Sequence, residues 1–427
     1  MNTDTGFRYL LRGGLLLTGI AFVSCVQRPN AKRSLPPLQL YDRILGGLLG
    51  SAAGDAMGAP TEMWSREAIQ AEYGHVDSLD DMVRDPSAEG TWKWNLPAGG
   101  TTDDTRWKKL VIEAFLSNSD SPARSLASAI VQEHDEAIGR MQEGQTLDSD
   151  YYADQLRQAQ WLSEWVKVAR PYLAGDRELY DDALHSFYGG EMVCAGMIYA
   201  PAVGLRYPND PERAYRVTYE TDIYDLGYAR DMAGLVAAMV SAAMDSSANG
   251  DSALSVIRSV DPKGYFRARL VSRTAYKLYQ RTLQITKLAN EVDTTAFFAS
   301  QPAVRLQLPI KTAAERLKYA RWSTAYELLD EELRRMPFHP DEIWMVTLTG
   351  MLMGEFDLQE SLAFIVNYGR DNDTSAAMAG AIIGAMTGAD AFPEAWKTTI
   401  LETSLELDLD FEDLARRLTD QIIQSPS

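Results

Sequence analysis

The feature that most constrains the fold of this chain is a stripe of glycines in its first long apolar segment, residues 43–60. Within that segment glycine recurs every four residues, at Gly50, Gly54 and Gly58. A spacing of four places the three positions on one face of an α-helix. Each glycine inside a helix costs about 1 kcal/mol relative to alanine. That cost makes sense where a second helix must come very close, so the stripe predicts a tightly packed helix pair.

A second stripe with the same spacing lies near the other end of the chain. Gly380, Gly384 and Gly388 follow one another in a segment of small residues, and residues 376–387 are predicted to be helical. Alternation with a period of two is nearly absent, so strands should contribute little. The sequence therefore predicts an all-α fold, a compact domain of many helices. Further helical segments are expected at 106–117, 122–141, 150–173, 230–244 and within 262–340.

Two other segments stand apart from the helical pattern. Residues 65–98 are expected to be irregular, either as a loop that arches over a site or as a plain surface excursion. Residues 188–197 form a further apolar run that is rich in glycine.

The composition excludes one class of function. The 427 residues include 41 Lys and Arg against 60 Asp and Glu, a net charge of −19, and the basic residues form no stripe. This pattern argues against a nucleic-acid-binding protein, which needs a basic surface to track phosphates. An acidic protein can still bind a phosphorylated small molecule if a bound cation supplies positive charge.

The N-terminus resembles the signal of a bacterial lipoprotein. Arg8 and Arg12 precede a short apolar stretch, 14–23, that is too short to span a bilayer. We expect a signal peptide at 1–24, lipidation of Cys25, a tether at 25–40 and the helical domain at 41–427. The protein would then be exported and anchored to a bacterial membrane through its N-terminal lipid, on the periplasmic or the cell-surface face. An ordinary signal peptide and a plain membrane anchor are the alternatives.

Two acidic clusters carry the chemical signal of the chain. Thr102, Asp103 and Asp104 precede an apolar helical segment, and alone they would most simply cap that helix. A second cluster, Asp371-Asn372-Asp373-Thr374, repeats the combination of carboxylates and a hydroxyl at the start of the glycine-striped helix 376–387. If the two clusters converge, their carboxylates repel one another unless cations are bound. Oxygen ligands of this kind suit one or two Mg²⁺-like ions. The four histidines show no ligand spacing, which disfavours zinc.

Three motifs in this order resemble the signatures of the ADP-ribosylglycohydrolase family, which includes dinitrogenase-reductase-activating glycohydrolase and the J1-type crystallins. The motifs are residues 50–62, 102–105 and 371–377. The resemblance implies an all-helical domain that binds two Mg²⁺ ions, or Mn²⁺, and hydrolyses the bond between an ADP-ribosyl unit and a protein or small acceptor. The metal-binding residues that it implies are Thr102, Asp103, Asp104, Asp371, Asp373 and Thr374.

The resemblance also assigns roles near the metals. Glu62, Asp103 and Asp104 are the catalytic residues that it implies, with Glu62 or Asp104 as the general base, while Asp55 is expected to support the site. The chain departs from the family pattern at 188–192 and 220–225, so the walls that choose the acceptor are expected to differ. A non-catalytic relative that binds metal or ligand is the alternative function, and a dinuclear phosphoesterase is a third.

Overall fold

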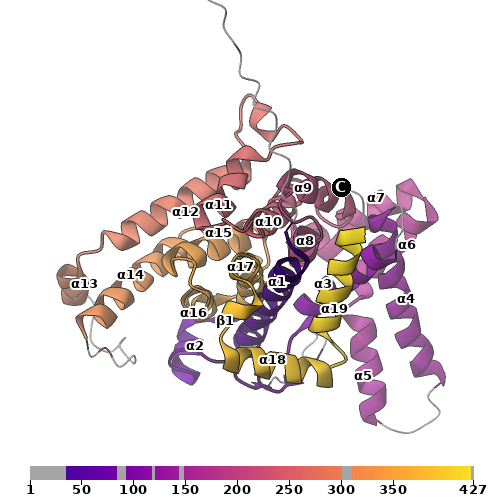
Figure 1. The fold of residues 1–427 in the computed structure, drawn as a ribbon, viewed down its shortest axis with the longest axis horizontal. Helices are drawn as coiled ribbons and strands as arrows, with labels where there is room; N and C mark the ends of the chain where they lie inside the picture. The colour runs from indigo at the N-terminus through magenta and orange to yellow at the C-terminus, as the bar shows by residue number, and fades with distance from the viewer. Residues whose placement is uncertain are drawn as a thin grey trace, which may run out of the picture. The chain divides into compact units, whose positions relative to one another are not determined.

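The two glycine-striped helices, α1 (Pro37–Gly58) and α17 (Asn372–Thr387), pack side by side in the middle of the fold (Figure 1). The structure is a computed structural model that describes residues 35–83, 93–117, 121–143, 149–300, 310 and 312–424. The signal peptide predicted at 1–24 and the lipidation site predicted at Cys25 lie outside these residues. Helix α1 begins inside the range 25–40 that we expected to be a tether, so ordered structure starts before Tyr41.

The described residues form nineteen α-helices, and short 3-10 helices (η) and two-residue strands join them. In chain order, the elements besides α1 and α17 are η1 (Ala59–Thr61), β1 (Trp64–Ser65), α2 (Arg66–Glu72), β2 (Met82–Val83), β3 (Asn95–Leu96), α3 (Asp103–Leu116), α4 (Pro122–Glu143), α5 (Ser149–Gln160), α6 (Ser163–Ala174), α7 (Arg177–Ser186), η2 (Phe187–Gly190), α8 (Ala195–Arg206), α9 (Pro211–Thr221), α10 (Ala229–Ala243), α11 (Gly250–Ser259), η3 (Tyr265–Arg267), α12 (Thr274–Asn290), α13 (Thr294–Ser300), α14 (Ala313–Asp330), α15 (Pro340–Met353), α16 (Leu358–Tyr368), β4 (Gly369–Arg370), η5 (Ala389–Ala391), α18 (Glu394–Glu406) and α19 (Phe411–Gln424). The prediction of an all-α fold is confirmed.

The core lies around α1, α8, α10 and α17. Nearly every residue of α10 is buried, and this helix packs against α8, α9 and α17. Helix α1 is flanked by α17 along its glycine face and by α19 on another side. Small residues dominate these contacts, since alanine and glycine allow helix axes to approach closely.

Two predictions need correction in detail. Residues 65–98 are not irregular throughout, because Ser65 accepts a hydrogen bond from the Ala68 amide and thereby caps the helix α2. The segment predicted as one helix over 150–173 is divided into α5 and α6 at Trp161 and Leu162. The long amphipathic region 262–340 contains α12, α13 and α14 as expected, and an irregular loop precedes α12.

The strands form two small antiparallel ladders. Trp64 pairs with Arg370 and Ser65 with Gly369, which joins β1 to β4. Met82 and Val83 pair with Leu96 and Asn95, which joins β2 to β3. Among the described residues no helix is both long enough and apolar enough to cross a lipid bilayer.

Candidate metal centre

The glycine stripes bring the two acidic clusters to the same end of the helix pair. A Cβ atom added to Gly50 would collide with the carbonyl group of Gly380, and one added to Gly54 would collide with the backbone of Ala376. At the end of the stripe, a Cβ on Gly58 would collide with the backbone of Asp373. The backbones of α1 and α17 are therefore in direct contact, and this contact continues as far as the second acidic cluster. The predicted close helix pair is confirmed.

Asp55 on α1 holds the first acidic cluster in place. Its Oδ1 accepts hydrogen bonds from the amide and the hydroxyl of Thr102, at 2.9 and 2.8 Å. Its Oδ2 accepts from the amide and the hydroxyl of Thr105, at 3.0 and 2.5 Å. The side chain is fully buried, and its four bonds fix the N-terminus of α3 against α1. This is the supporting role expected for Asp55.

The β1–β4 ladder brings Glu62 to the second cluster. Glu62 directly follows η1, and the next residue, Met63, donates its amide to the carbonyl of Arg370 at 2.7 Å. Asp371 follows Arg370 in the chain, so the ladder places Glu62 near Asp371. Met63 and Arg370 both have left-handed backbones, with φ of 65° and 66°. Such conformations cost energy and recur at functional sites.

The conformation of Arg370 is fixed by its side chain. The guanidinium group makes a two-pronged ion pair with Glu342, at 2.7 and 3.1 Å, and also donates to the carbonyl of Arg334 at 2.8 Å. Before it, Gly369 has a φ of 86°, and a Cβ there would lie 2.6 Å from the carbonyl oxygen of Trp64. The turn that presents Asp371 therefore requires a glycine and is supported by a buried acid.

Three carboxylates meet at this point. One oxygen from each of Glu62, Asp371 and Asp373 lies within 4.8 Å of the other two. Asp371 and Asp373 are buried, and Glu62 is half-buried. Asp371 occupies the N-cap position of α17, yet its side chain makes no capping hydrogen bond. Helix capping therefore does not account for a buried carboxylate at this position.

The donor set fits a divalent cation. Oδ1 of Asp373 is buried and has no hydrogen-bond partner, which is costly for a carboxylate unless an ion or a proton satisfies it. Carboxylate oxygens at this spacing are the ligands that Mg²⁺ and Mn²⁺ take. The N-termini of α3 and α17 both lie at the cluster, and their dipoles favour the negative charge there.

Asp104 connects the two clusters. Its Oδ2 accepts a hydrogen bond from the hydroxyl of Thr374 at 3.0 Å. Lys108, which is buried one turn further along α3, lies 3.5 Å from Oδ1 of Asp104 and donates to its backbone carbonyl at 2.9 Å. The sequence analysis missed Lys108, because a lysine four residues after an aspartate is a common surface pair. Here the pair is buried and partly neutralises the acidic site.

The remaining predicted ligands lie at the start of α3. Thr102 caps the helix by accepting from the Asp104 amide at 3.4 Å, while its own hydroxyl proton is donated to Asp55. Asp103 is half-buried, and it is not one of the three acids whose oxygens lie within 4.8 Å. The predicted site residues are thus gathered into one region, with Glu62, Asp371 and Asp373 closest together.

The pKa values reflect this crowding. Burial raises the pKa of Asp371 to about 8, and the charges of Glu62 and Asp104 add to the effect. Burial also raises the pKa of Asp104 to about 6, against the lowering effect of Lys108. The pKa values of Asp103 and Asp373 are raised well above the usual range, first by burial and then by neighbouring carboxylates. Shifts of this kind are typical of functional sites.

The glycine-rich segment 188–197 borders the acidic cluster. The thiol of Cys194 is buried, and the charges of Asp371 and Asp225 help to raise its pKa. Tyr188 has a left-handed backbone with φ of 44°, and burial followed by the charge of Asp103 raises its pKa to about 12. The ring of Tyr188 also contacts that of Phe338, with centroids 5.7 Å apart. Residues 188–192 of this segment are one of the two places where we expect the walls that choose the acceptor to differ.

A second departure, at 220–225, contains a buried acid pair that the sequence analysis did not assign. Asp222 and Asp225 are both buried, and Oδ2 of Asp225 accepts from the Gly196 amide at 2.9 Å. Burial raises the pKa of Asp222, against the lowering effects of Arg230 and Asp225. Burial raises the pKa of Asp225 well above its usual range, and the charge of Asp222 adds to the effect. Oδ2 of Asp222 and Oδ1 of Asp225 are buried without a hydrogen-bond partner, so we expect the pair to retain one proton between its two carboxyls. The pair anchors the first turn of α8 beside Cys194.

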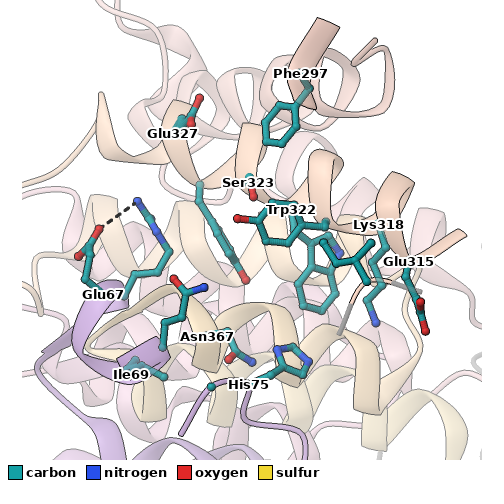
Figure 2. Close-up of a pocket in the computed structure, with 16 residues that line it drawn as sticks. Glu67, Ile69, His75, Phe297, Glu315, Lys318, Trp322, Ser323, Glu327 and Asn367 are labelled. Atoms are coloured by element: carbon teal, nitrogen blue, oxygen red, sulfur yellow. Dashed lines mark ion pairs between the residues drawn. The ribbon is translucent and has the colours of Figure 1, made fainter. Parts of the chain in front are cut away.

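A cavity of about 380 Å³ lies elsewhere, between α2, α14 and α16 (Figure 2). Its walls combine aromatic rings, among them Tyr319, Trp322 and Tyr326, with charged and polar side chains. At its edges Arg66 pairs with Glu67 at 3.9 Å, and Lys318 lies over the Trp322 ring. None of the predicted metal or catalytic residues lines it. The cavity is therefore separate from the metal centre.

Comparisons with known proteins identify the family of the chain. The family model of ADP-ribosylglycohydrolase matches residues 36–426. The chain is 24% identical over 405 residues to "ADP-ribosylhydrolase ARH3" of Danio rerio, which covers 91% of this chain and 93% of that protein. A 36-residue stretch, 8% of this chain and 11% of the relative, is 53% identical to "Uncharacterized protein YegU" of Escherichia coli strain K12.

A solved structure titled "ADP-ribosylglycohydrolase-related protein complex" is also similar, with a TM-score of 0.49 and 17% identity over 90% of this chain and 99% of the other. The family assignment does not depend on it, because the family model spans almost all of the described residues. Two glycine-striped helices in backbone contact, with the start of α3 held to α1 by Asp55, thus bring the two acidic clusters to one buried centre, and the chain belongs to the ADP-ribosylglycohydrolase family.

Proposed function

We propose that the protein is a divalent-metal-dependent hydrolase that cleaves an N- or O-glycosidic bond of an ADP-ribosyl or related ribosyl group and releases ADP-ribose. Its substrate is an ADP-ribosylated protein or a small ADP-ribosyl conjugate. The observation that carries the proposal is the convergence of Glu62, Asp371 and Asp373, with a buried oxygen of Asp373 left without a partner. Family membership supplies the substrate class.

Six residues are proposed to hold two Mg²⁺ ions, with Mn²⁺ as an alternative. When bound, the cations supply positive charge that orients the ribose hydroxyls and polarises water. The ligands come from the starts of α3 and α17. Helix α17 is in backbone contact with α1, and Asp55 of α1 holds the start of α3 through four hydrogen bonds, so the ligands are organised before the substrate arrives. They are Thr102, Asp103, Asp104, Asp371, Asp373 and Thr374.

Glu62 is proposed as the general base. Asp104 is less suited to this role, because Thr374 donates to one of its oxygens and Lys108 lies beside the other. In the proposed reaction water adds to the anomeric carbon as the bond from that carbon to the acceptor breaks. Glu62 takes the proton from the water, and the departing acceptor regains a proton. The positive character that develops at the anomeric carbon is favoured by the surrounding carboxylates.

The proposal includes an extracytoplasmic location. Export and lipidation at Cys25 are proposed from the N-terminal sequence alone, and they predict a mature protein whose first residue is an acylated cysteine. Mass spectrometry of the mature N-terminus tests this, with Cys25→Ser as the control that loses the acyl mass.

The activity is tested with the full chain in detergent. Peptides ADP-ribosylated through serine, arginine or glutamate, and simpler ribosides, are incubated with Mg²⁺ or with a chelator. We expect free ADP-ribose from at least one substrate, and only with the metal present. Glu62→Gln and Asp373→Asn should each lower kcat by at least about 100-fold, as expected for loss of a general base or a ligand. Glu402→Gln, a change at an exposed acid on α18, should have no effect.

Each contrary result has a distinct meaning. Metal binding without turnover of any substrate would favour the non-catalytic alternative. Release of AMP and ribose phosphate instead of ADP-ribose would indicate a phosphoesterase and contradict the proposed bond.

A further inference from the structure

The loop between α11 and α12, residues 261–272, is held firmly at its base. Arg273, the residue after the loop, makes a two-pronged ion pair with Asp231 of α10, at 2.8 and 2.6 Å. Both side chains are fully buried. The same guanidinium donates to the carbonyls of Ile257 and Val260, at 3.1 and 2.6 Å, just before the loop begins. One buried arginine therefore ties the two ends of the loop together.

A second set of contacts orders the first half of the loop. Asp261 accepts the amides of Tyr265 and Phe266, one on each carboxylate oxygen, at 2.8 and 3.0 Å. The ring of Phe266 meets the ring of Tyr276 on α12 edge to face, with centroids 5.3 Å apart. The loop is thus built on a rigid base.

The tip of this ordered loop is apolar and exposed. Residues 266–272 are all exposed, and among them Leu270 is 98% exposed and Val271 is 63% exposed. Adjacent aliphatic side chains that remain exposed on an ordered loop bury little apolar area, so they add little to the stability of the fold. They are typical of a surface that another phase or molecule covers.

The charges around the tip have the opposite sign to the protein as a whole. Arg258, Lys263, Arg267 and Arg269 are exposed, whereas the only acid between residues 258 and 272 is Asp261, which is engaged by backbone amides. The complete chain carries a net charge of −19. Four exposed cations within residues 258–269, close in sequence to two exposed aliphatic residues, match an anionic surface with an apolar layer beneath it.

We propose that the 261–272 loop docks onto anionic phospholipid, with Leu270 and Val271 entering the interface and the four cations facing lipid phosphates. Basic residues near an anionic membrane attract it, and a few apolar side chains at the boundary hold the contact in place. The loop contact is distinct from lipidation at Cys25 and from the proposed hydrolysis. It would fix one orientation of the folded domain on the membrane.

A dye placed on the loop tests the proposal directly. Leu270→Cys is made in the full chain carrying Cys25→Ser and labelled with an environment-sensitive fluorophore, because Cys194 is buried. We expect a blue shift of the emission, as for transfer from water to an interface, with phosphatidylcholine vesicles containing phosphatidylglycerol. Vesicles of phosphatidylcholine alone should give no shift. Replacing Arg267 and Arg269 by Glu should abolish the shift. Adding about 0.5 M salt should also abolish it, because salt shortens the distance over which the charges act.

The matched control is Leu179→Cys on α7, an exposed leucine flanked by acids. The control protein carries the same N-terminal segment as the test protein. The proposal therefore requires a spectral shift of the dye at position 270 and none at position 179. Equal shifts at both positions, or no shift at 270 with anionic vesicles, would overturn it. A dye at 270 that is already blue-shifted without vesicles would also overturn it, because the tip would then be covered by this chain, a second copy or a protein partner. Unchanged urea unfolding midpoints verify that each variant folds.

Discussion

At the scale of single residues, the site places stabilising and destabilising groups side by side. Asp55 makes four hydrogen bonds and supports the fold, whereas Asp373 is buried with an oxygen that has no partner. The first kind of acid contributes to stability, and the second kind costs stability unless a cation is bound. The two can be told apart by substitution.

Asp373→Asn is expected to have opposite effects on metal-free stability and on metal binding. The amide removes a buried negative charge from the cluster, so the metal-free variant should be more stable than the metal-free wild type by about 1–2 kcal/mol. Saturating Mg²⁺ should stabilise the wild type and leave the variant nearly unchanged. Urea unfolding with and without metal measures both effects. A variant that is less stable than the wild type in chelator would argue that Asp373 supports the fold.

The Asp225→Asn variant tests how the free energy of unfolding depends on pH at a position outside the proposed metal ligands. The folded-state pKa of Asp225 is raised, so the native protein keeps a proton that the unfolded chain releases at lower pH. The stability from this proton is fully present below the unfolded value of about 3.9. It is lost as the pH rises through the raised folded-state pKa.

The asparagine mimics the protonated acid at every pH. The unfolding free energy of the variant should therefore exceed that of the wild type by an amount that grows as the pH increases from 5 to 9. Acids that do not interact with Asp225 contribute equally to both proteins and cancel in the difference, so the difference reports the titration of the Asp222–Asp225 pair. Parallel pH profiles would contradict a shared proton between Asp222 and Asp225.

At the scale of elements, the fold depends on one helix pair. Gly50→Ala should destabilise the protein by about 3 kcal/mol or more, because the new methyl group would meet the carbonyl of Gly380 and not a side chain that can move. Gly139→Ala on α4 is the matched control, since a Cβ there has no neighbour within 4 Å. That change should stabilise the helix by up to about 1 kcal/mol. Chemical unfolding of both variants measures the contrast, and similar losses at the two positions would refute the close contact.

The sequence predicted those elements whose signal is periodic. The stripes at Gly50 and Gly380 gave the close pair, and the helix α10 was placed within one residue of its observed start. The β1–β4 ladder could not be predicted from the sequence, because strands of two residues contain no detectable alternating pattern. The helix α2 was missed because it is short and only Ile69 is buried in it.

The site was predictable for residues that occur in motifs and not for those that act through tertiary contacts. Asp55, Asp104 and Asp371 stand in recognisable motifs. The burial of Lys108 and the pairing of Asp222 with Asp225 depend on which helices pack around them. No local pattern encodes that information.

At the scale of the whole molecule, metal and ligand binding should be coupled. If the proposed function is correct, ADP-ribose should raise the melting temperature of the full chain in Mg²⁺ and have little effect in chelator. A ligand at 100 times its Kd stabilises by about 2.7 kcal/mol. Thermal unfolding in the four combinations of metal and ADP-ribose measures the coupling. Stabilisation by metal alone, with no response to ADP-ribose, would support a non-catalytic relative.

The backbone contact between α1 and α17 has a consequence for divergence within the family. Where two helices touch through glycine carbonyls, there are no rotamers to change and no side-chain volumes to exchange. The spacing between Asp55 and Asp373 therefore cannot drift through small compensating substitutions, as it can in an ordinary core. Mutations that alter substrate choice while preserving the metal centre must then accumulate in the surrounding segments. Residues 188–192 and 220–225, where we expect the walls that choose the acceptor to differ, are such segments.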